Sequence, residues 1–177
     1  MNKSVKEIVI SAAALMLIAG CVTAALAGTN ALTADTIAAS NERIATAARQ
    51  EVIDADDFTA ATLSTADGDV TYYTAVKGGK TVGYVFSVTT SGKSAGLVVM
   101  TGVSADGKIT GVKVVEQNET AGYVDKVLAA GLTDNLKGRD STDDVDAVSQ
   151  ATKTSNGIFK GVNKALSYYE QIKGVTA

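Results

Sequence analysis

The chain has 177 residues, of which 46% are hydrophobic, and carries 16 basic against 19 acidic side chains. This size and composition suit one compact domain with an added segment and argue against wholesale disorder. Histidine is absent and there is a single cysteine, which excludes imidazole catalysis, intrachain disulfides and four-thiolate metal centres. The net charge of -3 argues against nucleic-acid binding, which needs a basic face to displace counterions from phosphates.

An uncharged run of 20 residues, 8–27, dominates the N-terminus. As a helix with ~1.5 Å rise per residue it would extend ~30 Å, the thickness of a bilayer's hydrocarbon core. Lys3 and Lys6 precede the run, and the next basic residue is Arg43. The positive-inside rule therefore predicts a single-pass anchor in the cell (inner) membrane, with the N-terminus in the cytoplasm and residues 30–177 on the extracytoplasmic side.

Two alternatives for this segment stay open. Residues 25–27 (ALA) resemble a cleavage site, although the apolar run exceeds the ~7–15 residues of a signal peptide's apolar region. Residues 18–21 (IAGC) fit a bacterial lipobox that would lipidate Cys21, although the apolar run continues beyond that cysteine. We favour the uncleaved anchor, in which Cys21 is a small apolar residue of the helix.

Residues 33–53 are rich in alanine and free of glycine, which predicts a helix leading from the membrane into the domain, with Thr33 as N-cap. Two hairpins follow, because Gly78-Gly79 and Asp106-Gly107 each separate a pair of strand-like runs. The four predicted strands cover residues 70–76, 81–89, 97–104 and 109–116. Together they indicate an antiparallel sheet with one face buried.

The last third of the chain predicts two helices. Residues 123–132 form a short helical pattern, and residues 157–172 carry an amphipathic stripe. A polar, aspartate-rich loop over residues 133–146 lies between them. The order of elements is typical of an α+β fold, an antiparallel sheet with flanking helices behind one N-terminal transmembrane helix.

Three polar or small-residue segments exceed what folding alone requires. They are residues 91–96 (SGKSAG), 116–122 (EQNETAG) and 146–155 (DAVSQATKTS). Each also has an ordinary structural interpretation. The first could be a plain loop, the second a strand-to-helix turn with Thr120 as N-cap, and the third a Ser/Thr-capped helix start.

In their order and content these segments resemble the FMN-binding domain of the G subunit of Rnf complexes and of the related C subunit of sodium-pumping NADH:quinone reductase. In that family a motif Asp-x-x-Ser/Thr-Gly-Ala-Thr carries FMN, esterified through its phosphate to the final threonine. The matching residues here are Asp146, Ser149, Ala151 and Thr152. A single anchor and 177 residues make the chain more similar to the Rnf subunit than to the longer C subunit.

The resemblance implies covalent FMN on Thr152, in a domain over residues 59–177 that follows an anchor at 1–29 and a connecting helix at 30–58. The other implied cofactor-binding residues are Ser149 and Ala151 of the motif, and Glu119, Thr120 and Gly122 in a Glu-Thr-Pro-Gly-like turn. Beside the ester, Lys153 would add a positive charge and Thr154 a hydroxyl donor. A helix start favours a phosphate, because unpaired N–H groups and the positive end of the helix dipole lie there. Asp146 would repel a phosphate, and in the family it belongs to the sequence read by a flavin transferase.

Two residues depart from the family pattern. Gln150 replaces a glycine; if that position requires a positive φ angle, Gln150 is strained and attachment is slower. Ala121 replaces the proline of the turn, which loosens the turn without abolishing it.

The implied function is electron relay inside an Rnf-type ion-translocating ferredoxin:NAD oxidoreductase. The chain would be a subunit of that enzyme rather than a stand-alone catalyst, with other membrane and iron–sulfur subunits as partners and a flavin transferase for maturation. One alternative is a free-standing anchored FMN carrier outside Rnf. The other is a flavin-free binding domain tethered to the membrane.

Overall fold

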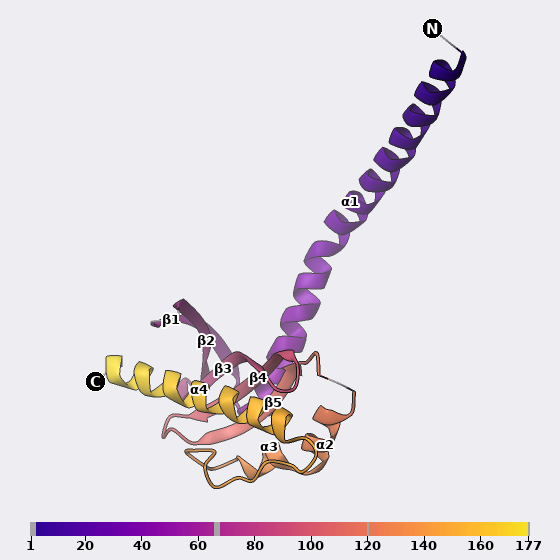
Figure 1. Ribbon diagram of the computed structural model, residues 1–177. Helices are drawn as coiled ribbons and strands as arrows, with labels where there is room; N and C mark the ends of the chain where they lie inside the picture. Colours follow the sequence, from indigo (N-terminus) through magenta and orange to yellow (C-terminus); the bar gives the residue numbers. More distant parts are fainter. Residues whose placement is uncertain (1–2, 66–67, 120, 177) are drawn as a thin grey trace. The chain divides into compact units, whose positions relative to one another are not determined.

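The computed structural model describes residues 3–65, 68–119 and 121–176, and the chain divides into two units, Met1–Ile44 and Ala45–Ala177, which are described separately. Helix α1 (Lys3–Val52; Figure 1) makes up the described part of the first unit, and its residues 45–52 belong to the second. Its segment Ile10–Ala34 is long and apolar enough to cross a membrane. This apolar helix suggests membrane anchoring.

Helix α1 is continuous, so the expectation that Thr33 caps a second helix is wrong. The Thr33 hydroxyl donates to the carbonyl oxygen of Thr29 at 2.9 Å, and the Thr29 hydroxyl donates to that of Ala25 at 2.9 Å. Threonines that bond back in this way need no break in the helix, and Gly28 between the two predicted segments costs only about 1 kcal/mol relative to alanine.

The second unit contains a five-stranded antiparallel sheet in the order β1-β2-β3-β4-β5. The strands are β1 (Asp57–Thr65), β2 (Gly68–Lys77), β3 (Lys80–Ser91), β4 (Ala95–Ser104) and β5 (Ile109–Glu116). The predicted α+β class and antiparallel sheet are confirmed. Gly78 and Gly79 have φ angles of 57° and 77°, and Gly107 has 85°, so both predicted turns use the left-handed region that favours glycine.

Strand β1 is the element that the sequence pattern did not indicate. Its residues are mostly alanine, serine and threonine, and most are exposed or partly exposed. The strand pairs along its whole length with β2. Its place in the sheet therefore depends on that pairing, because its own alternation of apolar and polar residues is weak.

The end of α1 packs on a patch of glycines in the sheet. A Cβ atom at Gly102 would lie 2.5 Å from the Val52 carbonyl oxygen, and one at Gly111 would lie 2.7 Å from Val52 Cα. The Thr110 hydroxyl donates to that same carbonyl at 2.6 Å. The missing side chains thus let the helix end approach the strands backbone to backbone.

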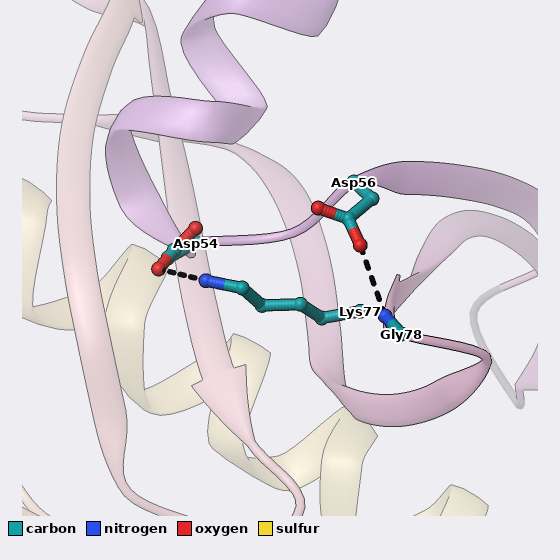
Figure 2. Close-up of polar contacts among 4 residues, drawn as sticks. All are labelled: Asp54, Asp56, Lys77 and Gly78. Atoms are coloured by element: carbon teal, nitrogen blue, oxygen red, sulfur yellow. Dashed lines mark hydrogen bonds and ion pairs between the residues drawn. The ribbon is translucent and has the colours of Figure 1, made fainter.

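Two aspartates after α1 bind the β2–β3 turn (Figure 2). Asp56 Oδ2 accepts a hydrogen bond from the Gly78 backbone N–H at 2.9 Å, and Asp54 forms an ion pair with Lys77. This hydrogen bond to Asp54 raises the pKa of Lys77 above its usual range. These contacts attach the link between α1 and β1 to the C-terminal end of β2, which lies beside the start of β1.

Helix α4 (Thr152–Thr176) covers the face of β3 and β4 opposite to the α1 end, and Figure 1 shows it running along the sheet. The helix begins five residues earlier than residue 157, where the amphipathic stripe starts. Two buried clusters lie between α4 and the sheet. One contains Leu97, Val99, Ile158 and Val162, and the other contains Phe86, Val103, Ala165 and Tyr169.

The helix predicted over residues 123–132 is two short helices, α2 (Tyr123–Ala129) and α3 (Leu132–Asn135). Gly131, at a φ angle of 71°, separates them. Of the predicted apolar face, Val124 and Val127 join the core cluster under α4, whereas Leu128 is exposed. Leu132, beyond the break at Gly131, packs in the core in its place.

Candidate functional site

The turn that enters α4 is held by a buried serine. Ser155 Oγ accepts a hydrogen bond from the Val148 N–H at 3.1 Å and donates to the Ala151 carbonyl at 3.1 Å. The Ala151 N–H donates to the Val148 carbonyl at 3.0 Å. Thr152, the first residue of the helix, keeps an exposed side chain whose hydroxyl lies 3.5 Å from the Val148 carbonyl oxygen. The hydrogen bonds of Ser155 thus hold the turn, and the Thr152 hydroxyl is left accessible to solvent.

Gln150 has a φ angle of 67° and is the one non-glycine residue with a positive φ in the described part of the chain. A side chain in the left-handed region costs roughly 1–2 kcal/mol, because Cβ crowds the backbone. Position 150, where the family has a glycine, therefore does require a positive φ angle, which is the condition under which the replacement by glutamine matters. The turn before Thr152 is strained by its own sequence.

Glu119 joins the three polar segments. Its Oε1 accepts a hydrogen bond from the Ser94 N–H at 3.0 Å, and its Oε2 accepts from the Lys93 N–H at 3.2 Å and the Thr154 hydroxyl at 3.1 Å. Thr154 is fully buried. One carboxylate, on the strand-to-helix segment, therefore connects the loop before β4 to the first turn of α4.

Two glycines let the loop and the helix touch. A Cβ at Gly92 would lie 2.6 Å from Glu119 Oε1 and 2.9 Å from Thr154 Cα, and one at Gly157 would lie 3.0 Å from the Gly92 nitrogen. The Thr90 hydroxyl closes the contact by donating to the Gly157 carbonyl at 3.0 Å. Side chains at either glycine would push the loop away from α4.

Cationic groups gather next to the exposed threonine. Lys93 Nζ lies 4.4 Å and Lys126 Nζ 5.9 Å from the centre of the Tyr123 ring, and Lys126 also donates to Gln150 Oε1 at 3.4 Å. A pocket of about 290 Å³ opens here, lined by Lys93, Tyr123, Gln150, Ala151, Thr152 and Lys153. Ammonium groups and an aromatic ring around an exposed hydroxyl make a site suited to an anionic, aromatic group.

The predicted site residues lie in different surroundings. Thr152 and Lys153 are exposed at the pocket, Ala151 is buried in its wall, and Ser149 is exposed in the preceding turn, as is Asp146. Thr154 and Glu119 point at each other, away from this exposed surface. Gly122, at a φ angle of 83°, is the N-cap of α2, and Thr120 lies outside the described residues.

Two residues of the pocket region were missed by sequence reasoning, Tyr123 and Lys126. Tyr123 directly follows the Glu119–Gly122 turn, and Lys126 lies one helical turn further on. An aromatic residue at the start of a helix beside a cofactor motif was a usable signal. The contact of Lys126 with Gln150 joins residues 24 positions apart, so no local pattern could indicate it.

Comparison with known families agrees with this geometry. Residues 92–167 match the FMN-binding domain, which places the β3–β4 loop, the Glu119 segment and the start of α4 within one flavin-binding module. Residues 1–52 match the RnfG N-terminal region, a match that includes all of α1. The chain therefore belongs to the RnfG type of FMN-binding subunit, as the resemblance implied. No curated protein matches the chain significantly.

The residues at the start of α4 fit FMN chemically. The flavin phosphate needs an accessible alcohol for an ester and positive charge around it, and the pocket offers the Thr152 hydroxyl with Lys93 and Lys153. The aromatic flavin ring needs an aromatic neighbour, and the Tyr123 ring, with Lys93 Nζ 4.4 Å from its centre, lines the same pocket. The structure thus contains residues for both parts of the cofactor.

Proposed function

We propose that the chain carries FMN covalently on Thr152 and serves as an electron-transfer subunit of an Rnf-type complex. The observation that supports this most directly is the contrast between two hydroxyls of one helical turn. The Thr154 hydroxyl is buried and bonded to Glu119, whereas that of Thr152 is exposed beside Lys153. Only the second can reach a large phosphate-bearing group.

The residues around Thr152 have separable roles in this proposal. Ester formation replaces the Oγ1–H bond of Thr152 by an Oγ1–P bond, so the protein gains one FMN less one water. Lys93 and Lys153 offset the phosphate charge, together with the N–H groups of the first turn of α4. Glu119 does not touch the flavin, because its carboxylate is occupied by the loop and by Thr154.

The bound flavin supplies the electron-transfer chemistry, while the chain supplies position and electrostatic environment. Attachment through Thr152 would keep the cofactor in place during repeated electron transfer to and from neighbouring subunits. The RnfG match suggests such neighbours. We propose that they include membrane and iron–sulfur subunits, and that a flavin transferase attaches the cofactor.

Membrane orientation is part of the same proposal. Lys3 and Lys6 precede the apolar segment of α1, and the next basic residue, Arg43, follows it. The positive-inside rule then places the N-terminus in the cytoplasm and the flavin domain on the extracytoplasmic side. On that side a covalent bond would also prevent loss of the cofactor.

The test is intact-mass spectrometry of the full-length chain co-expressed with a flavin transferase. The wild type should be heavier by one FMN less one water and fluoresce in a denaturing gel, and Thr152→Ala should lose both signals. Thr62→Ala, at an exposed threonine of β1, should keep them. An unmodified wild type, or a fluorescent Thr152→Ala band, would refute the attachment site.

A further inference from the structure

A second, larger cavity lies at some distance along α4 from Thr152, where strands β2 and β3 separate. Their pairing ends at Tyr72 and Phe86, whereas β2 continues along β1 to Gly68 and β3 continues along β4 to Ser91. Residues 68–71 and 87–91 thus each have a partner strand on one side only among the strands that the structure describes. In Figure 1, β1 and β2 run away from β3 at this end.

The cleft has a volume of about 800 Å³ and an excess of positive charge. Its charged lining residues are Arg49, Lys160, Lys164 and Asp69, a net of +2 from three cations and one anion. The Arg49 guanidinium carbon lies 3.5 Å from the centre of the Tyr73 ring, which fixes its position. Positive charge is therefore built into the cleft wall.

The cations lie on both faces of the sheet. Arg49 comes from the end of α1, on the face where Met100 and Tyr73 pack, and the two lysines come from α4, on the face of Phe86 and Val88. Lys160 and Lys164 are one helical turn apart and therefore point the same way. A chain lying in the plane of the sheet would have positive charge above and below it.

We propose that this cleft binds an extended acidic segment of a partner protein, which adds as a strand to the free edge of β3 at residues 87–91. Unpaired strand edges pair readily with another chain, and many recognition domains bind peptides in this way. Five residues of strand extend ~17 Å, and their side chains alternate between the two faces. Acidic side chains on successive residues would thus meet Arg49 on one face and the two lysines on the other.

A peptide suits this cleft better than a small anion does. Open backbone and the hydroxyl side chains of Thr71, Ser87, Thr89 and Ser91 line the cleft, whereas the Thr90 hydroxyl beside them already donates to the Gly157 carbonyl. A small ligand could satisfy one or two of these groups, whereas a strand pairs with the backbone N–H and C=O groups in a row. Ser91 precedes Gly92, so a segment bound here would reach the loop that Glu119 ties to α4.

Hydrogen exchange measured by mass spectrometry tests the proposal on the purified Rnf-type complex and on the isolated full-length chain in the same detergent. The amides of residues 87–91 that face away from β4 should exchange at least tenfold more slowly in the complex, because only these gain a hydrogen-bond partner. Residues 83–86 of β3, which already pair with β2 on one side and β4 on the other, serve as the internal reference. Equal exchange rates at residues 87–91 in the two samples would overturn the proposal.

Charge reversal tests the acidic character of the segment. The double variant Lys160→Glu, Lys164→Glu should lose the protection, whereas Lys80→Glu, an exposed lysine at the far end of β3, should keep it. Unchanged thermal unfolding of the double variant would show that the fold is intact. If residues 87–91 stay protected from exchange in the double variant, the proposal that the bound segment is acidic is refuted.

A photo-crosslinking residue at Thr89 in the assembled complex then identifies the occupant. The crosslinked peptide should contain acidic residues in a strand-like segment, and a crosslink to a neutral or helical segment would contradict the proposal. The complex carrying Thr152→Ala should show the same protection and crosslink. Failure of the flavin attachment and failure of the docking site are therefore distinguishable.

Discussion

The second unit brings backbones into contact at two places, with opposite results. Under the end of α1, Gly102 and Gly111 admit Val52, and the Thr110 hydroxyl closes the contact. At the start of α4, Gly92 and Gly157 admit the loop before β4, but the adjoining turn stays open and exposes Thr152. Glycine at a close contact therefore serves stability at one place and lies beside an exposed hydroxyl at the other.

The two places also differ in strain. The contact under α1 is made by apolar packing and one hydrogen bond between uncharged groups. The α4 start has a left-handed Gln150 and a carboxylate, Glu119, on which three donors converge. We expect substitutions at the first place to change stability, and substitutions at the second to change flavin attachment as well.

The largest effect is expected at the glycine contact. Gly111→Val would place its Cβ 2.7 Å from Val52 Cα, where only backbone can yield, so the free energy of unfolding should fall by about 3 kcal/mol. Denaturant titration of the full-length protein measures the loss. Thr62→Val, on the exposed strand β1, is the matched control and should change stability by less than about 0.5 kcal/mol. A stable Gly111→Val protein would show that α1 is not closely packed there.

The next effect concerns the carboxylate that joins loop and helix. Glu119→Gln keeps the shape but turns one acceptor oxygen into a donor facing N–H groups, which should cost about 2 kcal/mol and slow flavin attachment. Hydrogen exchange at the Lys93 and Ser94 amides should accelerate. Glu116→Gln, an exposed residue at the end of β5, is the control for loss of charge. If the variant attaches flavin at the wild-type rate although the Lys93 and Ser94 amides exchange faster, the Glu119 contacts are not needed for flavin attachment.

A smaller gain is expected from Gln150→Gly. Glycine removes the left-handed strain but loses more entropy on folding, so the net stabilisation should be about 0.5 kcal/mol. The yield of flavinylated protein, measured by intact mass, should rise. Gln150→Ala is the control, because it removes the same polar group but keeps the strain. An equal rise in both variants would assign the effect to the glutamine side chain.

The smallest effect belongs to the exposed ion pair of Figure 2. Because the hydrogen bond to Asp54 raises the pKa of Lys77, the pair's contribution is complete below the unfolded value of about 10.5 and is lost as pH rises through the folded pKa. The stability difference between wild type and Lys77→Met should therefore shrink above about pH 10.5. Thermal unfolding from pH 8 to 11.5 measures it, and a constant difference would contradict the assignment.

Local sequence determined those features whose signals lie within a few residues. The apolar run of α1, the glycine turns of both hairpins, the amphipathic stripe of α4 and the flavin motif ending at Thr152 each depend on neighbours in the chain. Glycines at turns, the spacing of apolar residues and a motif next to a helix start each have a physical meaning that does not depend on tertiary contacts. These signals were enough to predict the fold class and to propose the attachment residue.

Tertiary structure decided the features that depend on partners distant in sequence. Strand β1 exists because β2 pairs with it, and Glu119 links two segments because Lys93 and Thr154, 26 and 35 positions away, converge on it. The cleft at residues 87–91 arises where β2 leaves β3, which no local pattern records. Pairing and charge convergence are properties of the folded chain, since their free energies come from contacts that exist only after distant segments meet.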